Sequence, residues 1–468
     1  MSEDCLFVDV YMPTGPAPPG GFPVLFWIYP GGFIFGTGGF VAWDMYFDVV
    51  AAAEPVAIVT TAYRVAGMGF FAGDPLRADS PDGSVGNYGL QDQRAALQWV
   101  HDNAAAFGFN KNKVTIWGVS AGGASVSHLL ADPRAYGLFS GAIVESGAMA
   151  EWISFSYNET RDFYPKFAAD AGCPTGGPES LACLRAISWE NITLVNTIDF
   201  LSLDRWGPVV DGVEVPDFPR AMAARGQLAP NVSVLIGSNA DEGTLFAVPQ
   251  CLDLGMNTSA AYLACLSAYF GGALAPTIAG LYPPADFPAY PNATSSHWQA
   301  FARAVGDYMI TCPSRDQARW LTSPARAGGA RPTWAWQNVH QSYMLGLFFP
   351  WTGVMHATDI LFVLDMQGLM WGFGEASLQG LWIRYLTRFA AAGDPNGAGD
   401  PRWSQYGGAA ADLVAVFDTG ALGANVTMVQ GVRGALCDFW AAHQNLTDGA
   451  APARRARAGA RADLWGAL

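Results

Sequence analysis

Residues 118–122 read Gly-Val-Ser-Ala-Gly, a Gly-x-Ser-x-Gly pattern that places one serine hydroxyl between two glycines. The pattern follows an apolar run at residues 114–117, a predicted strand, and precedes a small-residue segment at 121–130, a predicted helix. A sharp strand-to-helix turn exposes the hydroxyl, and the flanking glycines leave room for a strained backbone. The N–H of Ala121 would then face the position where an oxyanion forms. This context predicts that Ser120 is the nucleophile of an acyl transfer.

A serine nucleophile needs a general base, and the chain contains six histidines. In one recurring order along the chain the nucleophile comes first, the acid second and the histidine last. His101 and His128 come too early in the chain for this order. His443 lies near the C-terminal end, and His297 lies in a polar loop. His340 and His356 remain, on either side of the aromatic and Gly-rich residues 342–353. We favour His356, because a small, apolar lead-in to a turn precedes it.

The acid is expected on a loop after a strand between these two positions. Residues 232–237 form an apolar run typical of a strand, and Asp241 and Glu242 follow it. A buried carboxylate there would hold the imidazole in the required tautomer and stabilise the imidazolium. Spacing alone does not choose between Asp241 and Glu242.

Two further backbone donors are expected from an early loop. Gly31 and Gly32 follow the predicted strand at residues 24–28 directly. Consecutive glycines let backbone N–H groups approach a substrate oxygen that side chains would block. Together with Ala121, Gly31 and Gly32 are the candidate oxyanion hole.

Apolar runs that alternate with helical patterns must position these residues. Further strands are predicted at 56–63 and 141–145, and a helix at 91–107. Such alternation predicts an α/β fold with a mostly parallel central sheet, helices on both faces, and active residues at the C-terminal ends of strands. Residues 150–335 contain few clean strands and are predicted to be a large helical insertion. We expect one domain over residues 1–447 and a flexible, Ala/Arg-rich tail over 448–468.

The composition excludes several classes of protein. The 25 Lys and Arg against 40 Asp and Glu leave a net charge of −15, which argues against a nucleic-acid partner. No uninterrupted apolar run reaches the ~18–20 residues of a membrane span. The seven cysteines lack the spacing of a structural metal site. The acyl transfer predicted for Ser120 implies neither a metal nor an organic cofactor.

Seven Asn-x-Ser/Thr sequons accompany these cysteines, a surplus that favours the secretory pathway and therefore a secreted, disulfide-bonded glycoprotein. The chain starts Met-Ser-Glu-Asp-Cys, without the charged and apolar regions of a signal peptide. Either the mature chain begins here, or an N-terminal piece is missing from this sequence. The odd number of cysteines favours the second alternative, with Cys5 left unpaired.

Several motifs in order resemble the type-B carboxylesterase and cholinesterase family of α/β-hydrolases, over most of the chain. Ser-Glu-Asp-Cys-Leu at residues 2–6 is similar to one family signature, and residues 87–93 with 118–123 are similar to the nucleophile region. The remaining motifs are Pro-Val-Val-Asp-Gly at 208–212, Asp-Glu-Gly-Thr at 241–244, Gly-Val-Met-His at 353–356 and Gly-Asp-Pro-Asn at 393–396. Several independent motifs in one order are highly specific.

This resemblance implies the α/β-hydrolase fold and assigns the open roles. Glu242 rather than Asp241 becomes the acid, His356 the base, and Gly31, Gly32 and Ala121 the oxyanion hole. It also implies disulfides between Cys173 and Cys183 and between Cys312 and Cys437, which leaves Cys251 with Cys265 as a third pair.

The sequence departs from the family pattern at three points. The family's N-terminal segment, which holds edge strands and the usual partner of Cys5, is absent before residue 2. Val119 stands where the family usually has Glu, which removes a negative charge near the imidazolium and is expected to lower activity. Pro30 replaces a glycine before the oxyanion pair, and its fixed φ and missing N–H are expected to shift that loop.

The expected function is hydrolysis of a small-molecule carboxylic ester through an acyl-enzyme on Ser120. Trp152 and Trp206 are candidate residues of a roomy acyl pocket that suits short or medium neutral esters. One alternative is a catalytically inactive adhesion or binding module, and another, within the same class, is a lipase. The sequence predicts no oligomeric state.

Overall fold

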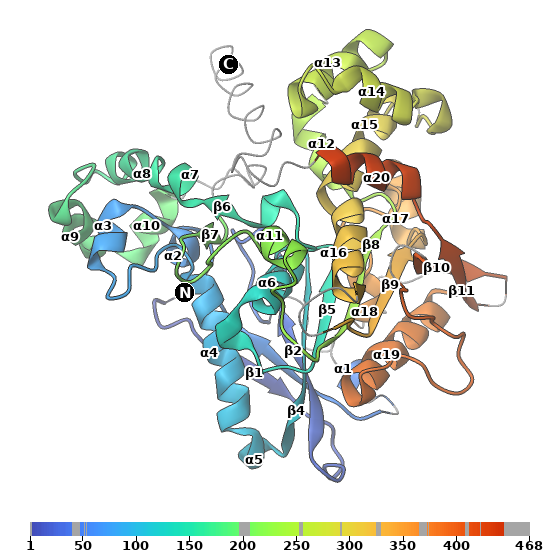
Figure 1. Ribbon diagram of the computed structural model, residues 1–468, viewed down its shortest axis with the longest axis horizontal. Helices are drawn as coiled ribbons and strands as arrows, with labels where there is room; N and C mark the ends of the chain where they lie inside the picture. Colours follow the sequence, from blue (N-terminus) through green and yellow to red (C-terminus); the bar gives the residue numbers. More distant parts are fainter. Residues whose placement is uncertain are drawn as a thin grey trace. The chain divides into compact units, whose positions relative to one another are not determined.

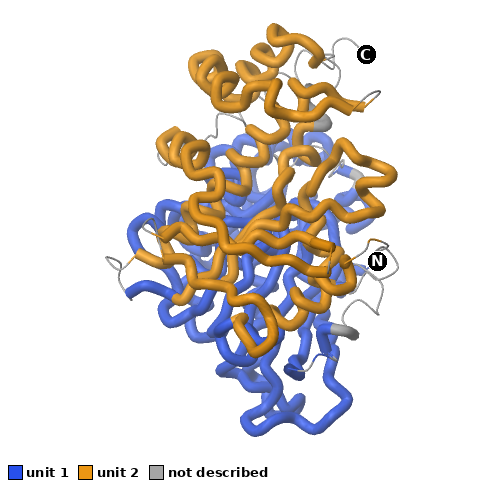
Figure 2. The backbone as a smooth tube through the Cα atoms, turned by 90° about the vertical axis from the view of Figure 1, so that its right-hand side faces the viewer, with its two compact units in different colours: residues 1–234, 325–331, 387–394 blue, residues 235–324, 332–386, 395–468 orange. Residues whose placement is uncertain are grey.

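The computed structural model describes residues 2–443, except 40–46, 51, 53, 196–205, 252–255, 291–292, 324–328, 365–371, 373, 408–410 and 422. The chain divides into two compact units (Figure 2). Unit 1 comprises residues 1–234, 325–331 and 387–394, and unit 2 comprises residues 235–324, 332–386 and 395–468. The tail predicted at 448–468 lies outside the described residues, and the prediction of one domain over 1–447 stays a prediction.

Unit 1 contains the first five strands in the order of a nine-stranded sheet, β1-β3-β2-β4-β5 (Figure 1). Its strands are β1 (Val8–Tyr11), β2 (Phe22–Ile28), β3 (Ala57–Thr61), β4 (Phe109–Val119) and β5 (Gly141–Glu145). β3, β2, β4 and β5 pair in parallel, and β1 adds an antiparallel edge. Every residue of β2, β3 and β5 is buried, as expected for parallel strands covered on both faces.

Helices pack on this sheet and position its C-terminal ends. α6 (Ala121–Ala131) starts directly after β4, and all eleven of its residues are buried. Its small side chains allow it to lie close to the strands. The predicted helix at 91–107 is instead two helices, α4 (Tyr88–Asp102) and α5 (Ala104–Phe107). The break falls at Asn103, whose side-chain amide and N–H both donate to the carbonyl of Trp99 and so cap α4.

The rest of unit 1 is largely helical. An aromatic cluster holds its insertion together, with Phe71, Phe167 and Trp206 in mutual ring contact. The remaining elements are α1 (Phe47–Val50), α2 (Ala66–Phe70), α3 (Asp74–Asp79), β6 (Phe155–Ser156), α7 (Tyr157–Arg161), α8 (Tyr164–Asp170), α9 (Pro178–Ala186), α10 (Trp189–Val195), β7 (Val209–Val210) and α11 (Pro219–Ala224). The unit 1 part of the helical insertion predicted over residues 150–335 is thus mostly helical where it is described, whereas the sheet strand β8 (Ser233–Asn239) also falls within the predicted range.

Unit 2 contains most of β8 (Ser233–Asn239), followed in the sheet order by β9 (Thr333–Asn338), β10 (Leu413–Gly420) and β11 (Gly423–Gln430). β9 and β10 are parallel, and β10 and β11 form an antiparallel hairpin. Trp382, Trp403 and Phe417 pack as a buried aromatic core. With the strands of unit 1, these confirm an α/β fold with mostly parallel strands.

The other helices of unit 2 are α12 (Gly243–Cys251), α13 (Ser259–Phe270), α14 (Ala275–Leu281), α15 (Ser296–Gly306), α16 (Cys312–Thr322), α17 (Tyr343–Phe348), α18 (Ile360–Val363), α19 (Glu375–Ala392, which extends beyond the unit) and α20 (Gly434–His443). A π-helical turn, Asp307–Thr311, joins α15 to α16. No single helix in the described residues is long and apolar enough to cross a membrane. Ser259–Phe270 and Ala275–Asp286 reach that length only as a pair, with a bend of 118° between them.

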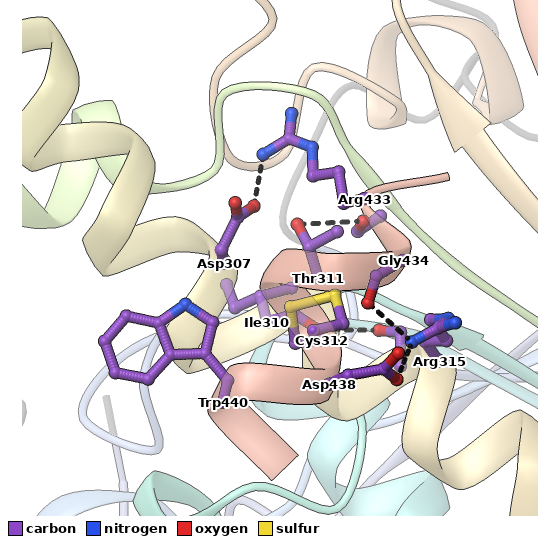
Figure 3. The surroundings of a disulfide bond; sticks show 12 residues. Asp307, Ile310, Thr311, Cys312, Arg315, Arg433, Gly434, Asp438 and Trp440 are labelled. Atoms are coloured by element: carbon purple, nitrogen blue, oxygen red, sulfur yellow. Dashed lines mark hydrogen bonds and ion pairs between the residues drawn. A yellow bond between two sulfur atoms is a disulfide. The ribbon is translucent and has the colours of Figure 1, made fainter. Parts of the chain in front are cut away.

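Two of the predicted disulfides are confirmed, Cys173–Cys183 in unit 1 and Cys312–Cys437 in unit 2. The second joins the start of α16 to α20, and Arg315 adds a contact across the same junction by donating to Asp438 (Figure 3). Cys265 is disulfide-bonded, but the side chain of its predicted partner Cys251 lies outside the described residues. Cys5 is exposed and free, as predicted.

Candidate active site

The strand-to-helix turn of unit 1 holds Ser120 in a strained backbone conformation. Ser120 lies between the end of β4 and the first residue of α6, with φ 58° and ψ −121°. A positive φ is rare for residues other than glycine and recurs at functional turns. Its N–H donates to the carbonyl of Glu145 (2.9 Å), and its carbonyl accepts from the N–H of Ala124 (2.8 Å). The backbone N–H and carbonyl of Ser120 are therefore both hydrogen-bonded.

The glycines around Ser120 are needed because other backbone segments come very close. A Cβ added at Gly122 would lie 2.0 Å from the carbonyl oxygen of Ile28, and one at Gly118 would lie 2.4 Å from the carbonyl carbon of Gly122. Neither obstacle is a flexible side chain that could move aside. The steric reason given for the Gly-x-Ser-x-Gly motif is thus met at both positions.

The predicted oxyanion loop follows β2 in the same unit. Gly31 and Gly32 have φ of 127° and 62°, and the carbonyl of Gly31 accepts from the N–H groups of Ile34 (3.0 Å) and Phe35 (3.2 Å). A Cβ at Gly31 would lie 2.0 Å from the carbonyl oxygen of Phe35. The turn after Pro30 is therefore closed by two hydrogen bonds and accepts only glycine at position 31. Ala121 begins α6, where the first N–H groups lack acceptors within the helix.

In unit 2, Glu242 and His356 form a short, buried contact. Glu242 Oε2 lies 2.5 Å from His356 Nδ1, and the side chains are 0% and 4% exposed. A carboxylate can only accept, so Nδ1 is the donor in this pair. The other ring nitrogen, Nε2, is buried and has no hydrogen-bond partner in the described part of the chain. It is therefore available to accept a proton.

Glu242 is itself held by Asn239. The N–H of Asn239 donates to Glu242 Oε1 (2.6 Å), and the amide Nδ2 of Asn239 donates to Asp359 Oδ1 (2.9 Å). Asn338 in turn donates from Nδ2 to the side-chain oxygen of Asn239 (3.0 Å). Sequence reasoning missed this buried network, for which the only signal was Asp359 three residues after His356.

The neighbouring carboxylate, Asp241, joins the acid loop to the base loop. Its N–H donates to the carbonyl of Val354 (2.9 Å), and its Oδ2 accepts from the N–H of Val354 (2.9 Å). Its Oδ1 forms an ion pair with Arg303. Burial alone would lower the pKa of Arg303, but Asp241 and Asp307 more than offset this and raise it. The geometry thus separates the two candidate acids, with Glu242 on the histidine and Asp241 on the loop that carries it.

A second histidine–carboxylate pair explains the place of His340, the other candidate base. Its Nε2 lies 3.1 Å from Oε1 of the buried Glu375, and its Nδ1 lies 3.1 Å from the hydroxyl of Thr419. Both ring nitrogens are engaged, so neither is free to take a proton from a serine. His128, which the chain order set aside, contacts the carbonyl of Ile153 (3.0 Å), and burial lowers its pKa to about 4.

The two tryptophans predicted for the acyl pocket lie in unit 1. Trp206 is only 5% exposed and packs edge-on against Phe71, Phe163 and Phe167. Trp152 is half-buried in a 3-10 turn, Glu151–Ile153. Residues 202–205, which precede Trp206, lie outside the described residues. Both tryptophans stay candidate pocket residues, and Trp206 has little surface to offer a substrate.

Ser120 and the oxyanion glycines thus belong to unit 1, and Glu242 and His356 belong to unit 2. Within the part of the chain that is described, no group of three or more His, Cys, Asp or Glu side chains has the geometry to hold a metal ion.

Comparison with known proteins agrees with the motifs. A model of the carboxylesterase family matches residues 1–440. The chain is 31% identical to secreted lipase 1 of Botryotinia fuckeliana, in an alignment that covers 86% of this chain and 71% of the lipase. It is also 31% identical to an acetylcholinesterase of Danio rerio, over 87% of this chain and 70% of that enzyme.

Proposed function

Since the chain belongs to the carboxylesterase family and is a carboxylic ester hydrolase, we propose that it cleaves esters through an acyl-enzyme formed on Ser120. His356 is the general base and Glu242 the acid that orients it. The backbone N–H groups of Gly31, Gly32 and Ala121 form the oxyanion hole.

In the acylation step, Ser120 Oγ attacks the ester carbonyl carbon while His356 Nε2 takes the hydroxyl proton. The carbonyl oxygen becomes an oxyanion that the backbone N–H donors stabilise. When the tetrahedral intermediate collapses, the C–O bond to the alcohol breaks and His356 gives its proton to the leaving oxygen. Water then attacks the acyl-enzyme with the same base, which releases the acid and restores Ser120.

The buried contact between Glu242 and His356 is the observation that supports this mechanism most strongly. It keeps the proton on Nδ1 and leaves the lone pair on Nε2, the tautomer that a general base needs. Low exposure of both side chains strengthens the contact when the imidazolium forms. An inactive binding module would have no need of this arrangement.

We propose short or medium neutral esters as substrates. Both candidate pocket side chains are apolar, and Trp152 is the one with more exposed surface, since Trp206 is only 5% exposed. The lipase and the cholinesterase that the chain resembles differ in substrate, so chain length is left to experiment.

We also propose passage through the secretory pathway, with glycans on the sequons. Two disulfides of the described chain support it, and every sequon asparagine that the structure describes is exposed: Asn158, Asn191, Asn231, Asn257 and Asn425. Asn292 and Asn445 lie outside the described residues. An exposed asparagine can carry a glycan without disturbing the core.

Labelling by a fluorophosphonate probe tests the mechanism. We expect the wild-type protein to label covalently and Ser120→Ala to lose the label. Ser125→Ala is a matched control, because Ser125 is a buried serine on the same helix and should leave labelling unchanged. A wild-type protein that fails to label, or a Ser120→Ala variant that labels equally, would overturn the proposal in favour of an inactive binding module.

A further inference from the structure

An apolar and exposed helix precedes the base-carrying loop. α17 and the next residue read Tyr-Met-Leu-Gly-Leu-Phe-Phe, and no residue of α17 is buried. The side chains of Tyr343, Leu347, Phe348 and Phe349 are 53, 58, 60 and 52% exposed. We name these four residues the apolar patch. Large exposed apolar side chains elsewhere in the described chain occur singly or as one pair, so this cluster is unusual for the molecule.

Hydrogen bonds hold the start of α17 in this exposed position. The N–H of Tyr343 donates to Oε1 of Glu375 (2.7 Å), a carboxylate with no exposed side-chain surface. Glu375 also accepts from the N–H of Gly372 (2.7 Å) and contacts His340. Burial alone would raise the pKa of Glu375, but these hydrogen bonds outweigh it and lower that pKa. The helix is therefore anchored at its first residue on a buried, ionised group.

The other end of the segment is anchored as well. Gln299 donates from Nε2 to the carbonyl of Trp351 (2.8 Å), and the Trp351 ring packs edge-on against Trp298 of α15. The hydroxyl of Thr352 donates to the carbonyl of Phe349 (2.8 Å). Both ends of the segment are therefore held in place, and the four apolar side chains between them are exposed.

The chemistry of the patch favours an uncharged surface. Residues 341–355 contain no Asp, Glu, Lys or Arg, in a chain with a net charge of −15. An anionic lipid surface would repel this chain, and a charged protein partner would find no ion-pairing group in the segment. Exposed Leu and Phe side chains are those that enter the boundary between water and lipid.

The size of the patch favours the same occupant over a second copy of the chain. Its four side chains expose roughly 450 Å² when ~150–250 Å² is taken for a large side chain. A stable dimer needs ~800 Å² from each partner. A few inserted side chains, in contrast, suffice for reversible attachment to a lipid surface.

The segment also leads directly to the candidate base. It runs from Phe349 through Thr352, whose carbonyl accepts from the hydroxyl of Thr244 (2.8 Å), to Val354 and His356. We propose that the apolar patch docks the enzyme on the surface of an aggregated, uncharged ester, such as a micelle or an emulsion droplet. This inference rests on the proposed function and adds that the substrate is presented at an interface.

The test compares wild type with the triple variant Leu347→Ser/Phe348→Ser/Phe349→Ser. Leu6→Ser/Phe7→Ser is the matched control, because those two residues are equally exposed, at 50 and 58%, but lie in unit 1. Hydrolysis of tributyrin is followed below and above its solubility limit. Flotation with phosphatidylcholine vesicles is measured separately on the Ser120→Ala background, so that binding is read without catalysis.

We expect the wild-type rate to rise steeply once droplets form. In the triple variant this rise should be at least tenfold smaller than in the wild type. Its rate on dissolved tributyrin should stay within twofold of the wild-type rate, and it should no longer float with the vesicles. The control should behave as wild type. Equal rise and flotation in the triple variant, or their absence in the wild type, would overturn the inference. So would a wild-type dimer that the triple variant dissociates. Failure of the wild type on dissolved ester would instead contradict the proposed function.

Discussion

Glu242 and Asp241 are neighbours in sequence with different contacts. Exchanging Glu242 for its amide should mainly lower activity, and exchanging Asp241 for its amide should mainly lower stability. Glu242→Gln keeps the size of the side chain but adds an N–H donor beside His356 Nδ1. To accept from it, His356 must move its proton to Nε2, and Nε2 then cannot take the proton of Ser120. The equivalent loss of tautomer control in a serine protease costs about 10⁴ in kcat, or about 5.5 kcal/mol of transition-state stabilisation. We expect a loss of that order and a change in unfolding free energy of about 1 kcal/mol.

Asp241→Asn should instead lower stability. The carboxylate accepts one N–H from Val354 and pairs with Arg303, whose side chain is only 28% exposed. Charge-assisted hydrogen bonds contribute about 1.5–3 kcal/mol each, so we expect a loss of about 2–4 kcal/mol in unfolding free energy. Because Glu242 is held by Asn239 rather than by Asp241, kcat should fall by about tenfold at most.

Steady-state hydrolysis of p-nitrophenyl butyrate and urea unfolding of each variant measure the two effects. Ser120→Ala sets the floor of activity. The reasoning fails if Glu242→Gln retains more than about a tenth of the wild-type kcat, because a tautomer switch should cost far more. Equal losses of kcat in both variants would refute the separation of roles.

Three further perturbations test other parts of the structure. The disulfide Cys312–Cys437 closes a loop of 125 residues, and Cys173–Cys183 closes one of 10. Replacing the first pair by Ser should therefore lower the free energy of unfolding by about 5 kcal/mol, and replacing the second by about 3 kcal/mol, as measured by urea titration. Equal losses would contradict the chain-entropy argument. The buried His128 has a folded pKa of about 4 against an ordinary 6.5, so the unfolded chain binds the proton first and stability should fall by roughly 3 kcal/mol between pH 6.5 and 4. His128→Gln should flatten this dependence, and an unchanged slope would assign it elsewhere. Expression through a eukaryotic secretory pathway should give a product whose gel mobility rises on glycan removal, with a smaller shift for each Asn→Gln change at the exposed sequons; an unshifted product would remove the glycan proposal.

The features that the sequence predicted well are those with local causes. The strand at residues 141–145 matches β5, and the predicted start of α6 at Ala121 is correct, because a continuous apolar run and a Gly-x-Ser-x-Gly turn are specified by adjacent residues. The antiparallel hairpin of β10 and β11 was not predicted. β11 mixes polar and apolar residues, and only Gly423 of the strand is buried, so it lacks a continuous apolar run. β10 does begin with such a run, Leu-Val-Ala-Val-Phe, but was not predicted as a strand.

The roles of the two carboxylates show where sequence reasoning ends. Asp241 and Glu242 have the same chemistry and adjacent positions, and only the family resemblance chose between them. The structure distinguishes the two by partners far along the chain. Asp241 contacts Val354 and Arg303, whereas Glu242 contacts His356. Long-range contacts of this kind leave no periodic or local signal in the sequence.

The departure at Val119 has a structural context that its position in the sequence did not reveal. Val119 is fully buried, and its partner in the parallel β4–β5 register is Glu145, which is 1% exposed. Glu145 Oε1 accepts from the indole N–H of Trp117 (2.7 Å), and the Glu145 carbonyl accepts the N–H of Ser120. Unit 1 therefore retains a buried carboxyl group one strand away from the position where the family usually has one. A second carboxylate at 119 would face Glu145 in a low-dielectric site, where two like charges cannot both be ionised at low cost. Valine at 119 is thus compatible with Glu145, and the lowered activity expected from Val119 stays a prediction.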